Sequence, residues 1–414
     1  MKYEKYYLED VKKESSKKLF NVISCFAGGG GSSTGYRYAG GDILLINEFV
    51  AEAISTYQAN FPDTKVLVDD IKKYTSDSFL EMANIKSGEL DILDGSPPCS
   101  AFSLAGKRDK GWKGHIEDTR ESYIDFDSDD FIHQTGGFEE KEGIKKYSDD
   151  KVQESIEDLF IEFIRIAKGI QPKVIVAENV KGITAGEAKK KLNEFINAFQ
   201  NIGYDVTYKV MNAAHYGVPQ ARERTMFVCV REDVCEAVGL NFMTLNNVFP
   251  EENKEMVTLR HALEGIENDK EEEQMLLDYV QGGFQKKWIE LLEFDPPKHL
   301  KPSDERFIDI NPKRSMFNMI RPCQDLPCPT LTQRGQQTVV SGVFHPMKNR
   351  KFTVPELKRI MSLPEDFVMK SDRETVAKRF DQSAERIGRM VAPKMMAALA
   401  NSLYEKVLRP FNEL

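Results

Sequence analysis

The sequence predicts an α/β protein whose core is a doubly wound, mostly parallel β-sheet with helices on both faces. Two observations support this fold class. Apolar runs of strand length alternate with helical patterns through the first half of the chain, and a glycine-rich loop follows the first of these runs. The size of the chain agrees, because 414 residues, 41% of them hydrophobic, suffice for one large core and a smaller attached domain.

The expected strands are short apolar runs bounded by glycine or polar residues, and the last of them would close the sheet. The clearest helical pattern, over 156–168, places its apolar side chains on one face. We expect strands at 20–25, 43–46, 66–68, 90–93, 174–177 and 225–230, and helices at 49–59, 156–168 and 384–406.

The pattern changes after about residue 240. Residues 251–312 are rich in Glu, Asp, Lys and Pro, and no alternation of strands and helices is visible there. We therefore expect a separate small domain in this part of the chain, whereas the apolar stripe at 384–406 indicates core packing.

Composition excludes several classes of protein. No apolar run is long enough to cross a bilayer. The N-terminal segment is charged and lacks the apolar core that a secretory signal has. The six cysteines form no CxxC pair and no Cys/His metal spacing, so we expect a reducing intracellular protein without a metal site.

The net charge of −9 is unusual for a nucleic-acid binder. It does not exclude one, because phosphate binding needs a local basic surface and not a basic total. Local basic clusters occur, although each is also compatible with a solvated surface patch. They lie at Lys107, Arg108, Lys110 and Lys113, at Lys286 and Lys287, at Lys313 and Arg314, and at Lys348, Arg350 and Lys351.

The glycine-rich loop, Phe26-Ala-Gly-Gly-Gly-Gly31, is a candidate ligand-binding loop. Glycines such as Gly28 and Gly30 let the backbone approach a ligand closely. Glu48 follows Gly28 by 20 residues, which is where an acid reaches ribose hydroxyls in dinucleotide-binding folds. Phe49 could lie against an adenine and Asp70 could accept from its amino group. A core aromatic and a capping acid explain the same residues equally well, and NAD competes as the cofactor at this point.

Three further segments carry reactive side chains. Residues 94–104, Asp-Gly-Ser-Pro-Pro-Cys-Ser-Ala-Phe-Ser-Leu, hold Cys99 where a strand ends. Glu178 stands in Val-Ala-Glu-Asn-Val, at the end of the next expected strand, and Gln-Ala-Arg-Glu-Arg spans 220–224. A buried, inert thiol is the commonest state of a free cysteine, but the two prolines and the downstream acid and arginines favour a nucleophile.

Together these segments closely resemble the cytosine-5 DNA methyltransferase family, whose signatures are a Pro-Cys loop, a Glu-Asn-Val strand end and Gln-x-Arg-x-Arg, in this order. The resemblance extends to Phe26–Gly30, to Asn47-Glu48-Phe49 and Asp69-Asp70-Ile71, and to 321–332 and 387–393. It implies methyl transfer to carbon 5 of a cytosine flipped out of double-stranded DNA, with S-adenosylmethionine as donor. The fold it implies is the Rossmann-like, doubly wound sheet of S-adenosylmethionine-dependent methyltransferases with a small inserted target-recognition domain.

The resemblance also assigns roles to individual residues. The Cys99 thiolate adds to C6 of cytosine, and Glu178 protonates or hydrogen-bonds N3. Arg224 binds O2, and Arg222 supports the site. The remaining site residues follow by position in the family motifs. They are Phe26, Gly28, Gly30, Glu48, Phe49, Asp70, Ile71 and Pro98 for the cofactor, and Ser103, Lys107, Arg108 and Thr330 for DNA.

The domains follow from the same resemblance. Residues 1–241 and 328–414 form the expected catalytic, cofactor-binding domain, and 242–327 the target-recognition domain. Two features depart from the family. Position 389 is Arg where the family has Asn, and 114–150 is a long acidic insertion in the catalytic loop. The insertion is either a tolerated surface segment or one that occupies the basic cleft of the free enzyme.

Four alternative functions remain open on the sequence. They are an RNA cytosine-5 methyltransferase on the same scaffold, an amino-group methyltransferase, an NAD-dependent oxidoreductase and an inactive DNA-binding module. Cys99 in the Pro-Pro-Cys loop argues against the second. The set of Cys99, Glu178 and Arg224 would have no purpose in the third, and the intact set of motifs argues against the fourth. For a DNA methyltransferase we expect a monomer in the bacterial cytoplasm or nucleoid, with a cognate restriction endonuclease that acts separately.

Overall fold

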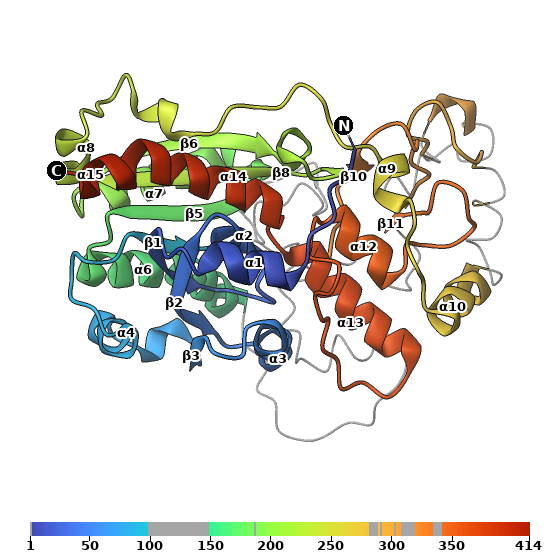
Figure 1. Ribbon diagram of the computed structural model, residues 1–414, viewed down its shortest axis with the longest axis horizontal. Helices are drawn as coiled ribbons and strands as arrows, with labels where there is room; N and C mark the ends of the chain where they lie inside the picture. The colour runs from blue at the N-terminus through green and yellow to red at the C-terminus, as the bar shows by residue number, and fades with distance from the viewer. Residues whose placement is uncertain are drawn as a thin grey trace.

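A seven-stranded sheet forms the centre of the molecule (Figure 1). The computed structural model describes residues 2–97, 149–185, 188–280, 289, 292–301, 304–307, 319–333 and 342–414. Along the sheet the strand order is β3-β2-β1-β4-β5-β8-β6. The bounds are β1 Phe20–Cys25, β2 Gly41–Glu48, β3 Lys65–Val68, β4 Ile92–Gly95, β5 Val174–Val180, β6 Tyr204–Asn212 and β8 Glu223–Arg231.

All pairs from β3 to β5 are parallel, whereas β8 runs antiparallel to both β5 and β6. The prediction that 225–230 closes the sheet was therefore wrong. The corresponding strand lies inside the sheet, and β6, which the sequence analysis missed, forms the edge. The mixed polar and apolar sequence of β6, YDVTYKVMN, explains the omission, because one face of an edge strand need not be apolar.

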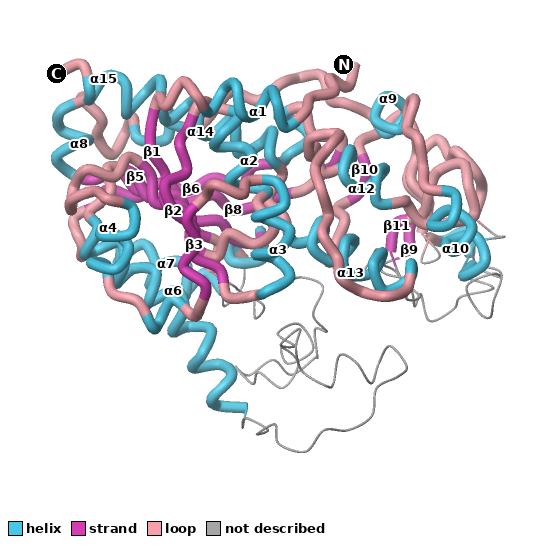
Figure 2. The backbone as a smooth tube through the Cα atoms, turned by 60° about the horizontal axis from the view of Figure 1, so that its bottom comes forward, coloured by secondary structure: helices cyan, strands magenta, loops and turns pink. Residues whose placement is uncertain are grey.

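Helices cover both faces of the sheet, as the fold class requires. Alternate strand residues enter two separate cores: Val22 and Ile92 face one, and Ile23 and Leu93 face the other. Figure 2 shows α1, α2 and α14 on one side of the strands and α4, α6 and α7 on the other. Their bounds are α1 Leu8–Ser15, α2 Gly31–Tyr38, α14 Pro393–Leu403, α4 Ser76–Ala83, α6 Asp149–Ile170 and α7 Ala188–Gln200, and α3 spans Ala51–Asn60.

The single helix expected at 384–406 is two helices. The first, α13, spans Val376–Arg389, and the second, α14, begins at Pro393. A proline has no amide hydrogen and disfavours helical geometry at the residue before it. The helix is therefore interrupted at Met390–Ala392. The apolar spacing continued across this break and concealed it.

A second group of elements gathers beside the large sheet, on the right of Figure 1. A small separate core lies there, formed by Ile289, Leu292, Leu300, Phe307, Met319 and Phe344. The elements of this side are α9 Leu259–Leu263, α10 Lys270–Val280, α12 Val354–Ile360 and α13, with the short strands β7 Gln220–Ala221, β9 Met319–Ile320, β10 Cys328–Pro329 and β11 Gly342–Val343. Among the described residues no helix is long and apolar enough to span a membrane.

Candidate active site

The carboxyl ends of four neighbouring strands meet at one edge of the sheet. Cys25, the last residue of β1, is in register with Asn47 of β2 and with Gly95 of β4. Gly95 is in turn in register with Ala177 of β5. The segments that follow these strands are therefore neighbours although they are far apart in sequence. In open α/β sheets this edge is where ligands bind.

The glycine loop between β1 and α2 has the left-handed backbone that its sequence requires. Phe26 has φ 55°, and Gly30, which precedes α2, has φ 99°. A Cβ at Gly31 would lie 2.5 Å from the carbonyl oxygen of Val391, so the link between α13 and α14 packs directly on this loop. A Cβ at Gly28 would meet no atom of the described residues within 4 Å, and the loop therefore borders space that these residues leave open on that side.

The Glu48 carboxylate joins the glycine loop to the end of β2. Its Oε2 accepts a hydrogen bond of 2.7 Å from the amide of Gly28, and its Oε1 accepts from the amides of Phe49 and Val50. The Glu48 side chain is buried, whereas Phe49 is 55% exposed. The structure thus brings together Gly28, Glu48 and Phe49, three of the residues predicted to hold the cofactor.

Asp70 and Ile71 follow β3 along the same edge. The Asp70 carboxylate accepts from the amide of Lys72 at 3.0 Å and caps a short 3₁₀ helix, Ile71–Lys73. Ile71 is buried in the core beneath the sheet. A local structural role therefore accounts for both side chains in this structure, and the capping role of Asp70 is the one that the sequence also allowed.

Glu178 and Arg224 form an ion pair at the end of β5. The Nε of Arg224 lies 2.8 Å from Oε1 of Glu178, and the two side chains are 14% and 12% exposed. They come from neighbouring antiparallel strands, where Val180 is in register with Arg224. Burial lowers the pKa of Arg224, and the carboxylate of Glu178 opposes that shift. A carboxyl group and a cation thus lie side by side at the edge of the sheet where the carboxyl ends of the parallel strands meet.

Arg222 and Thr330 bind the chain's own backbone. The guanidinium of Arg222 is fully buried and donates to the carbonyls of Leu331 and Gly388, each at 2.9 Å. The hydroxyl of Thr330 donates to the carbonyl of Ala221 at 2.7 Å. Arg222 therefore positions the segments that surround the site, as expected for a supporting residue.

These features form a polar site at the carboxyl edge of the sheet, and comparison with known proteins decides the family. The family model of the C-5 cytosine-specific DNA methylases matches residues 20–126 and 141–405. The chain belongs to this family. The predictions of the fold class and of a DNA (cytosine-5) methyltransferase are confirmed, and DNA is favoured over RNA as the substrate.

Two curated relatives match this methylase over most of their length. The Type II methyltransferase M1.HphI of Haemophilus parahaemolyticus is 29% identical, over 92% of this chain and 86% of the relative. The Type II methyltransferase M.DdeI of Desulfomicrobium norvegicum is 27% identical, over 92% and 88%. Among solved structures, the S. pombe Dnmt2 methyltransferase aligns with a TM-score of 0.55 at 17% identity, over 93% of this chain and 98% of that one, and shares the fold.

Several predicted site residues of the methylase lie outside the described part of the chain. The description of β4 and the loop after it ends at Pro97, a buried residue two positions before Cys99. The predicted residues outside the described ranges are Pro98, Cys99, Ser103, Lys107 and Arg108, together with the insertion 114–150 up to the start of α6.

The sequence analysis missed one polar residue of this edge. Asp94 of β4 is 2% exposed and accepts hydrogen bonds from Ser24, Ser32 and Tyr36. The available signal was weak: an acid at the end of an otherwise apolar strand, with serines before and after the glycine loop. Which of these side chains meet depends on strand register, which the sequence does not display.

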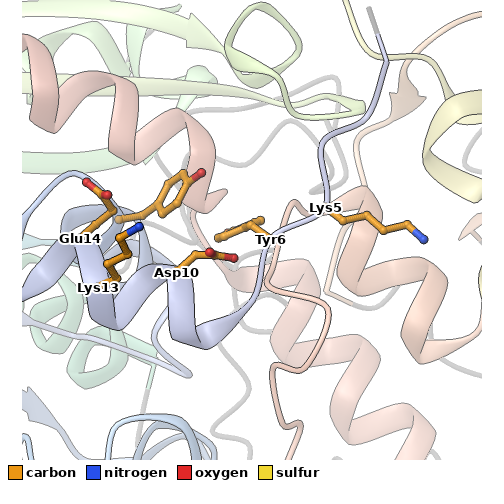
Figure 3. A pocket seen from close by; sticks show the side chains of 6 residues that line it. Lys5, Tyr6, Asp10, Lys13 and Glu14 are labelled. Atoms are coloured by element: carbon orange, nitrogen blue, oxygen red, sulfur yellow. The ribbon is translucent and has the colours of Figure 1, made fainter.

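Two surface cavities of the methylase border its N-terminal segment. One, of about 400 Å³, is lined by side chains of that segment and of α1, with Tyr38 (Figure 3). The other, of about 350 Å³, lies between Lys5 and Tyr7 on one side and Lys358 and Arg359 on the other. None of the residues predicted for catalysis or cofactor binding lines either cavity. The described residues contain no group of three or more His, Cys, Asp or Glu that could hold a metal ion.

Proposed function

We propose that this DNA methylase takes its methyl group from S-adenosylmethionine, bound at the glycine loop. The open space beside Gly28 supports this proposal, because a ligand there would lie against the Glu48 carboxylate. That carboxylate suits the ribose hydroxyls of the donor, and the exposed ring of Phe49 offers a flat apolar surface to its adenine. When bound, S-adenosylmethionine supplies an electrophilic methyl group on a sulfonium centre.

The remaining residues predicted for the cofactor are Phe26, Gly30, Asp70, Ile71 and Pro98. We propose that they border the same space, Ile71 through its backbone, because its side chain is buried in the core. Phe26 and Gly30 shape the loop through their positive φ angles. Asp70 and Ile71 stand at the end of β3, next to β2 in the sheet.

We propose that Cys99 is the nucleophile. Carbon 5 of cytosine is a weak nucleophile, and addition of a thiolate to C6 converts the ring to an enamine that can attack an electrophilic methyl group. The bond from sulfur to C6 forms, and the electron pair displaced from the C5–C6 double bond moves toward N3. After methyl transfer, a base removes the proton on C5, the double bond returns, and the thiolate of Cys99 leaves.

Glu178 and Arg224 are suited to stabilise the negative charge that develops on the cytosine ring during this reaction. A carboxylic acid at Glu178 can protonate or hydrogen-bond N3, and the guanidinium of Arg224 can hold O2 of the same ring. The 2.8 Å ion pair between them is the observation that carries the proposal, because N3 and O2 are adjacent on cytosine and need adjacent partners. The cytosine must leave the duplex to reach them.

DNA that contains 5-fluorocytosine at the methylated position tests the nucleophile. Fluorine does not leave as a proton does, so elimination stalls and wild type should form an adduct with DNA that survives SDS. Cys99→Ser should form none, while Cys235→Ala, which alters a buried cysteine of α8 (Glu232–Ala237), should form it as wild type does. Methyl transfer by wild type without any adduct would exclude Cys99 as the nucleophile.

We propose that 242–327 selects the DNA sequence and that 1–241 and 328–414 carry the chemistry, with 114–150 as a surface insertion. The separate small core around Leu292 and Phe307 supports an exchangeable unit. Leu245, Val248 and Leu259, by contrast, pack in the main core. Ser103, Lys107, Arg108 and Thr330 are the proposed DNA contacts.

Exchange of this segment for that of a relative tests the division. Because the first part of 242–327 packs in the main core, exchange of 281–327 should disturb folding less than exchange of the whole segment. A changed methylation sequence, read by sequencing the methylated cytosines, would support the assignment. Unchanged specificity in a folded, active chimaera of the whole segment would refute it.

The relatives named Type II methyltransferases support a role in restriction and modification. We propose that this methylase acts as a monomer on DNA in the bacterial cytoplasm, and that a cognate endonuclease acts separately. Light scattering of the free protein tests the first point. Protection of host DNA from a nuclease encoded beside the methylase gene tests the second.

A further inference from the structure

A buried carboxyl group lies directly beneath the glycine loop. Asp94 is the third residue of β4 and is 2% exposed, and none of the described lysines, arginines or histidines forms an ion pair with it. A buried carboxylate without a cation costs free energy unless hydrogen bonds compensate for the lost water. Its presence at this position therefore indicates a role that an apolar residue would not fill.

Three hydroxyl groups donate to this carboxyl. Ser24 Oγ and Ser32 Oγ lie 2.7 and 2.9 Å from its Oδ2, and the hydroxyl of Tyr36 lies 3.1 Å from its Oδ1. A carboxylate can accept all three bonds, whereas a protonated carboxyl must use one oxygen as a donor. The arrangement thus favours the ionised form of Asp94.

The donors lie on both sides of the glycine loop. Ser24 precedes the loop on β1, and Ser32 follows it in the first turn of α2. Asp94 consequently fastens both ends of the loop to β4, a different strand from the one that carries the loop. Gly31, between the two ends, packs so closely against Val391 that a Cβ there would lie 2.5 Å from its carbonyl oxygen, so the loop is also enclosed on that side.

We propose that Asp94 is a positioning residue for methyl-donor binding, and that its carboxylate holds the glycine loop in the conformation that receives the donor. This inference rests on the proposed binding of S-adenosylmethionine at that loop. Asp94 is 2% exposed and its carboxylate accepts from the three hydroxyls, so we assign it no direct contact with the donor. Its effect passes through Ser24 and Ser32.

The charge of Asp94 depends on pH. Burial raises the pKa of Asp94 to about 6, while its hydrogen bonds with Ser24, Ser32 and Tyr36 lower it. The titratable groups that face it are Tyr36 on α2, Cys25 on β1 and Glu178 on β5. Protonation below about pH 6 removes an acceptor that the loop needs, so the affinity for the donor should fall with acidification.

Calorimetric titration of the full chain with S-adenosylmethionine, from pH 5 to pH 8.5, tests this effect. We expect the affinity of wild type to decrease below about pH 6. The isosteric variant Asp94→Asn should bind about tenfold more weakly at pH 8, because its amide accepts through one oxygen only. It should also lack this decrease, because an amide does not titrate in this range. Titration of the donor itself is common to both proteins and cancels in the comparison.

Two further variants address the hydrogen bonds. Tyr36→Phe and Ser32→Ala each remove a bond that lowers the pKa of Asp94, so the decrease in affinity should begin at a higher pH than in wild type. Asp91→Asn is the matched control, since Asp91 is a buried acid that directly precedes β4 and pairs with Lys173. It should keep the pH profile of wild type.

The outcomes separate this inference from the proposed function. A wild type that binds no S-adenosylmethionine at any pH would refute the assigned donor. A wild type that binds it with the same affinity and pH profile as Asp94→Asn would overturn the role of Asp94 alone. If Asp94→Asn does not fold, a pH profile of Tyr36→Phe identical to that of wild type would overturn it equally.

Discussion

Arg224 Nε lies 2.8 Å from Glu178 Oε1, in an ion pair that joins two antiparallel strands at the ligand edge of the sheet. Both side chains are largely buried, so each lowers the cost of burying the other. The pair is therefore both a structural contact and a ready set of polar partners for a cytosine ring. Substitutions can separate these two contributions.

Glu178→Gln should lower the rate of methyl transfer to DNA by about 10²–10⁴-fold, because an amide cannot supply the proton for N3. Incorporation of labelled methyl groups into DNA measures this rate, and calorimetry should show unchanged binding of S-adenosylmethionine. Glu223→Gln is the control, since Glu223 is an exposed acid of β8 that pairs with Lys181. A Glu178→Gln enzyme as fast as wild type would contradict the proposed role.

Arg222→Lys should reduce the free energy of unfolding by about 1–3 kcal/mol, because lysine leaves one of two buried carbonyls without a donor. Arg224→Lys, which keeps a charge beside Glu178, should mainly lower kcat. Urea unfolding and steady-state kinetics on both variants distinguish them. Equal stability of wild type and Arg222→Lys would show that Arg222 does not hold the segments around Leu331 and Gly388.

Glu48→Gln should weaken binding of S-adenosylmethionine by at least about 1.4 kcal/mol, or tenfold. The amide can still accept from the backbone at one position but not at both, so the link to Gly28 or to Phe49 is lost. Glu52→Gln, on the adjacent helix α3, should bind as wild type does, because Glu52 pairs with Arg373 at the surface. Equal affinity of wild type and Glu48→Gln would exclude Glu48 from the donor site.

Gly95→Ala should destabilise the fold by about 1–3 kcal/mol, because overpacking displaces neighbouring side chains. The new Cβ would lie 2.5 Å from the ring of Phe163 on α6. Phe163→Leu makes room at this position, so the cost of Gly95→Ala should be smaller in that background. Chemical unfolding of the two single variants and the double variant gives the coupling, and additive effects would contradict the contact.

The free energy of unfolding of wild type should rise relative to that of Asp94→Asn as the pH falls. The pKa of Asp94 is raised from 3.8 to about 6 in the folded state, so the native protein binds more protons than the unfolded chain between these values. Its contribution to stability therefore increases as the pH falls from above 6 to below 4, by roughly 3 kcal/mol. Unfolding free energies of both proteins at pH 8 and pH 5 measure the first part of this change, about 1.4 kcal/mol. A difference that does not change with pH would contradict the raised pKa.

The sequence by itself determined the class of fold and the order of the site segments. The strand Phe20–Cys25, the glycine loop after it and the acid at the end of β2 are local patterns, and the structure contains each of them. Local hydrophobic periodicity suffices for such elements, because it states which face of a strand or helix is buried. The family likewise followed from short motifs in a fixed order.

Only the tertiary structure decided which side chains meet. The insertion of antiparallel β8 between β5 and β6 places Arg224 beside Glu178, and the register of β1 with β4 places Ser24 beside Asp94. Neither register can be predicted from the local sequence, because a polar residue at a strand end does not indicate which residue lies opposite it on the neighbouring strand. The break before Pro393 was a local signal, but the continuing apolar spacing outweighed it. Contacts between residues far apart in sequence depend on packing of the whole core, and for that reason the polar partners of Asp94, Glu178 and Arg222 emerged only from the fold.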